Sequence, residues 1–206
     1  DTQLTIDRQS VRTQRLCRRH TGRSSSGPSA VPQCWVFARS GRANQYWPAL
    51  WEKAYATWKD HDNNTPDYGR IDGGWPATAI SELTGRPAQT TTSSKFLAVP
   101  CNCPLGYAIC PMVASTYAGD PAVYNQGSGI SGNHAYTVLG VLNENGASYV
   151  VLRNPWGWLE GNVNIPQTNA FTRMSDGLRV TLNEGGVFAI RQDSFEVLFE
   201  EVAWQT

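Results

Sequence analysis

The spacing of apolar residues predicts helices in the first part of the chain. In YWPALWEKAYATWKD, residues 46–60, apolar side chains recur every three or four positions, and Pro48 suits the first turn of a helix. We interpret the aromatic residues of this segment as core packing. A second helix is predicted in WPATAISELTG, with Pro76 in its first turn and Gly85 at its end.

A pair of strands is predicted further along the chain. Residues 134–142 and 148–153 have strand patterns, and the linking NENGA contains Asn145 and Gly146, a pair typical of a two-residue hairpin turn. We therefore expect an antiparallel hairpin in which the start of the first strand lies beside the end of the second.

The remaining patterns are shorter. CWVFAR, residues 34–39, favours a strand, and after a polar Thr/Ser segment the chain is expected to be irregular through Gln126. GVFAI predicts a strand that ends at Ile190. In DSFEVLFEEV, Asp193 and Glu196 have the spacing of a capping box, so a short helix is predicted to close the chain. Helices followed by antiparallel strands indicate the α+β class.

Composition limits the number of domains. The chain has 206 residues, 40% of them hydrophobic, which is enough for one or two compact units. No run approaches the roughly 18 apolar residues that span a bilayer, so no transmembrane segment is predicted.

Charge is unevenly distributed although the net charge is zero. The first 23 residues contain six arginines against two aspartates, and such a basic arm could contact nucleic acid, an anionic membrane or an acidic partner. The simpler interpretation is a solvated tail. TGRSSSGPSAVP, residues 21–32, has the composition of a linker. We therefore divide the chain into a flexible arm, residues 1–30, and a folded unit, residues 31–206.

The cysteines indicate a reducing compartment. There are five, and an odd number fits an intracellular, cytoplasmic location better than a disulfide framework. CNCPLGYAIC, residues 101–110, lacks the CxxC spacing of a zinc site, so no metal is assigned there. A disulfide from Cys101 or Cys103 to Cys110 is an alternative to ordinary thiols.

His134 and Asn154 occupy the two ends of the predicted hairpin that should meet. An imidazole that acts as a general base needs a fixed tautomer and ring orientation, and an Asn carbonyl on the adjacent strand can supply both. Trp156 would shield this bond from water. The alternative is a structural histidine bonded to a backbone carbonyl, with Asn154 as a residue of an Asn-Pro turn.

Several motifs in order resemble those of calpain-type cysteine peptidases, within the papain-like superfamily. GNHAYTVLGV and VVLRNPWG are similar to the family's His and Asn motifs, and YWPALWEKAYA is similar to a helix between its two subdomains. GRIDGGWPATAISELTG and NEGGVFAIRQDSFEVLFEEV resemble the Gly-Gly segment and the end of the protease core. The resemblance covers most of residues 35–204.

The resemblance implies a papain-like protease core and a Cys–His–Asn triad in a cleft between two subdomains. His134 would be the general base and Asn154 the residue that orients it. Trp156, with Gly73 and Gly74 of the Gly-Gly segment, would support the cleft. The implied reaction is hydrolysis of a peptide bond in a polypeptide substrate.

The nucleophile departs from the family pattern, in which it precedes the EKAYA helix by well over fifty residues. Cys34, in QCWVFA, is a candidate, but its run reaches Ser40 and Gly41 too soon for a helix that would lower the thiol pKa. Cys17 has basic neighbours but lies in the arm. We therefore expect the nucleophile in a missing N-terminal part or a separate chain, unless it has been lost.

Calcium regulation is implied by the resemblance, but no ligands match. Trp158 replaces the acidic residue expected after NPWG, and Glu160 is displaced from that position. No cofactor is assigned.

Two functions follow from the sequence. The first is a calpain-like cysteine endopeptidase core, or the part of one that contains His134 and Asn154. The alternative is a catalytically inactive domain that serves as a binding or assembly module and uses its basic arm to contact an acidic partner.

Overall fold

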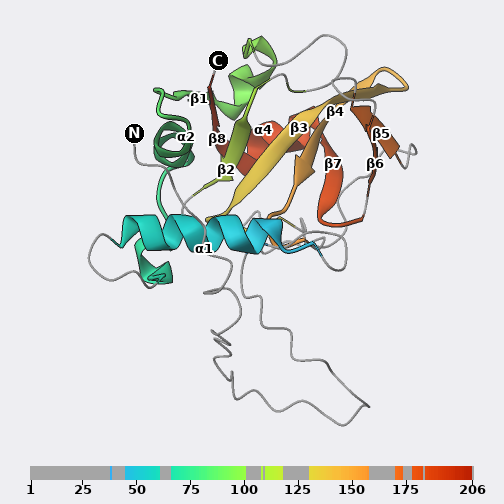
Figure 1. Ribbon diagram of the computed structural model, residues 1–206. Helices are drawn as coiled ribbons and strands as arrows, with labels where there is room; N and C mark the ends of the chain where they lie inside the picture. Colours follow the sequence, from blue (N-terminus) through green and yellow to red (C-terminus); the bar gives the residue numbers. More distant parts are fainter. Residues whose placement is uncertain are drawn as a thin grey trace, which may run out of the picture.

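The computed structural model describes residues 38, 45–60, 66–100, 108, 110–117, 130–157, 170–173, 178–182 and 184–205 (Figure 1). The predicted arm and the predicted strand at 34–39, apart from Ala38, lie outside these residues. So do Cys17, Cys34, Cys101 and Cys103.

Both predicted helices are confirmed. Helix α1 spans Trp47–Lys59, and α2 spans Pro76–Thr84, each with a proline in its first turn. Gly85 ends α2 in the left-handed conformation, with φ of 70°. A short 3-10 helix, η2, lies between them at Tyr68–Arg70.

Glu82 joins the two helices. Its carboxylate accepts a hydrogen bond from Lys59 Nζ at 2.7 Å and another from the Tyr55 hydroxyl. These bonds, the one from Lys59 first, hold the pKa of Glu82 below its ordinary value of 4.5.

The interpretation of the α1 aromatic residues as core is wrong for three tryptophans. Trp47, Trp51 and Trp58 are 59%, 61% and 40% exposed, whereas the buried residues of α1 are Pro48 and Ala56. The helical period agrees with the prediction, but α1 packs through a different side.

A six-stranded antiparallel sheet forms the centre of the fold (Figure 1). Its order is β1-β8-β2-β3-β4-β7, and every pairing in it is antiparallel. The bounds are β1 Gln89–Thr92, β2 Met112–Thr116, β3 Ala135–Glu144, β4 Ala147–Arg153, β7 Val187–Arg191 and β8 Phe199–Trp204. Helix η3 spans Ser93–Ala98, α4 spans Gln192–Leu198, and β5 Ala170–Arg173 pairs separately with β6 Leu178–Thr181. The predicted α+β class is confirmed.

The predicted hairpin is β3 and β4. Glu144 pairs with Ala147, and the turn residues Asn145 and Gly146 have φ of 51° and 77°. Positive φ at both turn positions is the requirement that Asn-Gly satisfies in a type I′ turn.

Two predictions about the sheet are wrong. The stretch expected to be irregular contains β2, and the chain continues beyond α4 into β8. Strand β1 lies in the polar Thr/Ser segment that precedes that stretch. FEEV resembles a continuing helix, but β8 lies between β1 and β2 and its backbone is paired on both sides. Tertiary pairing therefore overrides the local helical preference.

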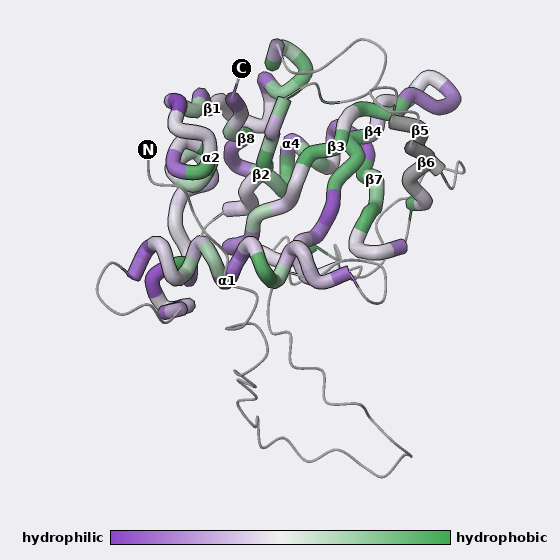
Figure 2. The backbone as a smooth tube through the Cα atoms, in the orientation of Figure 1, coloured by the Kyte–Doolittle hydropathy of each residue, from purple (hydrophilic) through white to green (hydrophobic). Residues whose placement is uncertain are grey.

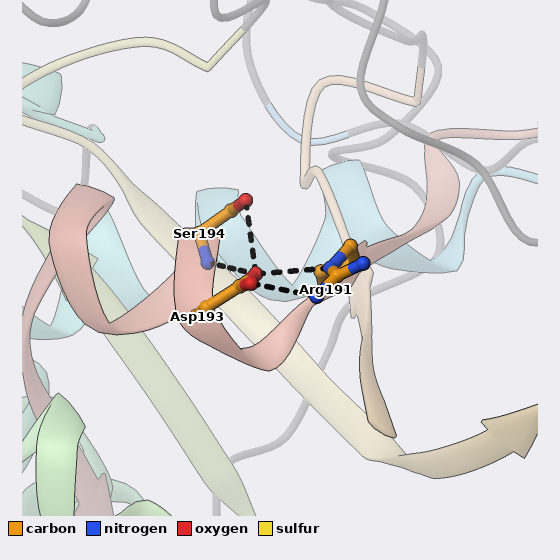
Figure 3. A network of polar contacts seen from close by, with 3 residues as sticks. All are labelled: Arg191, Asp193 and Ser194. Atoms are coloured by element: carbon orange, nitrogen blue, oxygen red, sulfur yellow. Dashed lines mark hydrogen bonds and ion pairs between the residues drawn. The ribbon is translucent and has the colours of Figure 1, made fainter. Parts of the chain in front are cut away.

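The capping box is also absent. Asp193 lies inside α4, after the N-cap Arg191, and no side chain caps the helix. Figure 3 shows that its carboxylate instead accepts hydrogen bonds from the Arg191 guanidinium, at 2.8 and 3.2 Å, and from Ser194.

Apolar residues cover both faces of the central sheet. Figure 2 shows hydrophobic positions along β2, β3, β4 and β7. On one face Tyr136 packs edge-on against Phe199, which stacks on Phe195 of α4. A smaller cluster that includes Val151 and Ala189 forms separately. Among the described residues no helix is both long and apolar enough to cross a membrane.

Candidate active site

His134 is held at the start of β3 by the end of β2. Its backbone N–H donates to Thr116 Oγ1 at 2.9 Å, and its carbonyl accepts from the Thr116 N–H at 2.9 Å. Thr116 Oγ1 also lies 3.0 Å from the carbonyl oxygen of Ser131. The backbone of His134 is therefore held by hydrogen bonds at both its N–H and its carbonyl, independently of the contacts of its side chain.

Asn154 follows β4 and is fully buried. Its backbone N–H donates to the Gly186 carbonyl at 2.8 Å, and its own carbonyl accepts from the Gly157 N–H at 3.1 Å. Its side-chain Oδ1 accepts from the Trp156 N–H at 3.0 Å and lies 3.1 Å from His134 Nε2. The structure thus brings His134, Asn154 and Trp156 together, as the hairpin predicts.

These contacts define the tautomer of His134. The Trp156 N–H can only donate, so the amide atom that faces it is the oxygen. The same oxygen faces His134 Nε2, which must therefore carry the proton. In the neutral ring Nδ1 is then the unprotonated nitrogen, the one that can accept a proton from a thiol.

Aromatic rings flank the imidazole on two sides. The Trp156 ring lies 4.1 Å from it, centroid to centroid, at 33°, and the buried Tyr136 ring lies 4.8 Å from it at 87°. The Tyr136 hydroxyl accepts a hydrogen bond from the Ser131 N–H at 3.0 Å. Packing of this kind keeps water from the His134–Asn154 bond and strengthens it.

Tyr136 and Thr116 were missed from the sequence. Tyr136 is two positions after His134 and therefore shares its face of β3, which is a signal that strand periodicity offers. Thr116 gives no local signal, because it belongs to a strand that the sequence did not predict.

Gly73 and Gly74 adopt left-handed conformations, with φ of 80° and 111°, immediately before α2. Within the described part of the chain no hydrogen bond joins them to His134 or Asn154. A Cβ on either would have no atom within 4 Å. Their predicted place in a cleft stays a prediction.

Cys110 is disulfide-bonded, and its partner lies outside the described residues. The interpretation of Cys110 as an ordinary thiol is therefore wrong, and the alternative of a disulfide holds for it. While bonded, this sulfur is no nucleophile. Cys34 lies outside the described residues.

The described residues contain no cluster of acidic side chains for the calcium that the resemblance implies. No group of three or more His, Cys, Asp or Glu side chains among them could hold a metal ion, whereas calcium takes six to eight oxygen ligands. Trp158 and Glu160 lie outside the described part.

An α+β domain with this His–Asn pair at the base of a hairpin has the arrangement of a cysteine-protease core. A model of the calpain family of cysteine proteases matches residues 28–204, and the chain belongs to that family. The relatives support a calpain-like peptidase core and do not favour the inactive binding module.

Three relatives illustrate the match. A thiol protease from Porphyromonas gingivalis is 34% identical over 185 residues, which is 82% of this chain and 38% of that protein. A calpain from Schistosoma mansoni is 27% identical over 194 residues, 81% of this chain and 23% of its own length. The calpain-type cysteine protease DEK1 of Arabidopsis thaliana is 27% identical over 188 residues, which is 85% of this chain and 8% of that protein. The chain thus spans well under half the length of each.

Proposed function

We propose that this chain supplies the general base and the orienting amide of a calpain-like cysteine endopeptidase. The observation that carries the proposal is the 3.1 Å contact of His134 Nε2 with Asn154 Oδ1, in which the Trp156 N–H sets the direction of the amide. A buried amide that fixes one tautomer of a histidine is the arrangement that a thiol nucleophile requires.

His134 Nδ1 takes the proton from the nucleophilic thiol, and the thiolate attacks the carbonyl carbon of a peptide bond. The resulting imidazolium then gives its proton to the leaving amine as the C–N bond breaks, which leaves an acyl-enzyme. Water, deprotonated by the same imidazole, hydrolyses the thioester. Asn154 keeps the ring oriented throughout, Trp156 excludes water and lines the cleft, and Gly73 and Gly74 support the cleft.

Polypeptides are the substrates that the family indicates. The source of the thiol is part of the proposal: it comes from another part of the polypeptide or from a separate chain, with Cys34 as the candidate within this chain. The arm, residues 1–30, is proposed to contact an acidic partner, and the family match beginning at residue 28 supports separating it from the core.

The proposed cytoplasmic location rests on the odd number of cysteines. The disulfide at Cys110 weighs against it, because disulfides are rare in reducing compartments.

Thiol labelling tests the proposal. The native chain, the His134→Ala variant and a His61→Ala control are treated with iodoacetamide, and mass spectrometry locates the label. Fast labelling of Cys34 that only His134→Ala slows would identify a nucleophile within this chain. Fast labelling that is equal in all three proteins would contradict a base role for His134. Slow labelling throughout would mean that the thiol comes from elsewhere.

A further inference from the structure

Cys110 is the one cysteine in the described part of the chain, and its sulfur is in a disulfide. It directly precedes Pro111 and strand β2. Ala108 and Cys110 both pack against the main core cluster, which also contains Met112 and Tyr136. The disulfide therefore belongs to the segment that covers this core and leads into β2.

Among the described residues, hydrogen bonds hold this end of β2 only weakly. Met112 pairs with Trp204 of β8, but the pairing of β2 with β3 begins at Val113. The Pro111 carbonyl accepts from the Gln205 N–H at 3.3 Å, which is longer than a usual N–H···O bond. Proline has no N–H of its own to add to the ladder. The neighbouring disulfide, which is covalent, is therefore the strongest connection at this end of the strand.

The same segment is bonded to a bulge in β3. The Ala108 N–H donates to the Leu139 carbonyl at 3.0 Å. The register of β3 against β4 shifts between Val138 and Gly140, so Leu139 has no partner residue in β4 and its carbonyl can accept from a segment outside that ladder. This hydrogen bond and the disulfide together hold Ala108 and Cys110 against β3.

The opposite end of β2 holds the histidine. Thr116, the last residue of β2, exchanges hydrogen bonds with the backbone of His134. Tyr136, whose ring packs edge-on against the imidazole, belongs to the core that Ala108 and Cys110 cover. Because β2 has only five residues, a change at its start is close to both of these contacts.

We propose that the disulfide of Cys110 is a redox-sensitive lock on the start of β2. A dithiol reductant opens the lock: two hydrogen atoms pass to the protein, its S–S bond is replaced by two thiols, and the reductant becomes a disulfide. The freed segment then separates from β3 and from the core, and the pairing of Thr116 with His134 opens more often. Conditions that reduce this disulfide therefore weaken the site, even though they keep a nucleophilic thiol free. This goes beyond the proposed function, because it makes the position of the base depend on the redox state of a second sulfur.

Thermal unfolding of the full 206-residue chain tests the lock. Dithiothreitol should lower the melting temperature of the native chain by about 5–10 °C. Cys110→Ala is the matched control: its melting temperature should already be low and should not fall further with dithiothreitol. An unchanged melting temperature of the native chain, or an equal fall in both proteins, would overturn the proposal.

Amide hydrogen exchange of the native chain, read by NMR, tests the connection to His134 without any variant. Dithiothreitol should speed exchange of the Ala108 and His134 N–H groups at least tenfold, because both lie on the segment that the lock holds or beside the strand that it leads into. The Asn154 N–H, which is bonded to Gly186, is the reference and should change much less. Equal acceleration of all three N–H groups, or no acceleration at Ala108 and His134, would reject the connection.

These measurements need no catalysis, so the lock and the proposed function can fail separately. Faster exchange on reduction, together with iodoacetamide labelling that is indifferent to His134→Ala, would retain the lock and reject the function. Labelling that requires His134, together with exchange and melting that dithiothreitol leaves unchanged, would retain the function and reject the lock.

Discussion

A Cβ atom on Gly186 would lie 2.7 Å from the carbonyl oxygen of Asn154. Gly186 also has φ of +80° and accepts the hydrogen bond from the Asn154 N–H. The backbone at the orienting amide is therefore placed by a close approach that only glycine permits.

Gly186→Ala should consequently destabilise the fold by about 2–3 kcal/mol, from the left-handed backbone and the clash together. Gly146→Ala is the control, since Gly146 has a similar φ of +77° but open space around the added atom, and should cost only about 1 kcal/mol. Urea unfolding measures both. Equal losses would mean that the approach to Asn154 carries no cost.

Thr116 should stabilise the fold through its hydroxyl. Thr116→Val keeps the shape but removes the acceptor of the His134 N–H, and an unsatisfied buried N–H costs about 1–3 kcal/mol. Thr116→Ser, which keeps the hydroxyl, should recover most of that loss. Thermal unfolding of the two variants distinguishes the outcomes, and equal melting temperatures would contradict the role of the hydroxyl.

A carboxylate in place of the Asn154 amide should favour the protonated form of His134. In Asn154→Asp the negative charge beside Nε2 favours the imidazolium, so the pKa of His134 should rise by about one unit or more. Asn154→Ala should give no such rise. NMR titration of the three histidines, with His134 assigned from a His134→Gln variant, measures the shift. An unchanged pKa in Asn154→Asp would contradict the close contact.

Glu82 should contribute to stability in a pH-dependent way. Its folded pKa is lowered by Lys59 and then Tyr55, so its contribution is present above the unfolded pKa and is lost as pH falls through the folded value. The side chain is 24% exposed, and Glu82→Gln should cost less than about 1 kcal/mol at pH 7. That difference should disappear in acid.

Glu52 provides a control of opposite sign. Burial raises its pKa, against the hydrogen bond from Ala38, so its charged form is disfavoured in the folded state. The stability difference between Glu52→Gln and the native chain should therefore move in the variant's favour as pH rises. Denaturant unfolding between pH 3 and 8 measures the free energies of unfolding of Glu82→Gln and Glu52→Gln. The same pH dependence in both variants would contradict the opposite pKa shifts of Glu82 and Glu52.

The hairpin and the His134–Asn154 contact were predictable because their determinants are local. Asn145-Gly146 sets the turn, and strand alternation then places residues on either side of it. Strand β8 was not predictable in this way, because its state is decided by partners more than eighty residues earlier in the chain, such as Met112 with Trp204.

The core of the site depends equally on distant residues. Gly186 directly precedes β7, and Thr116 is the last residue of β2. Neither is close to His134 in the sequence, so no spacing around His134 predicts them. For α1 the period of the apolar residues correctly predicts a helix, but it does not predict which side of the helix packs against the domain. Tyr55, Lys59 and Glu82 decide that through tertiary contacts.

The position of β8 also sets the order in which the sheet can be completed. As the chain is synthesised, β1 and β2 emerge long before the strand that separates them, and each has an open edge until residues 199–204 are available. Loop closure over such separations slows folding, and open edges invite pairing with other chains. Loss of β8 after a cleavage just before Phe199 would therefore separate β1 from the rest of the sheet, and would leave an unpaired edge on both β1 and β2.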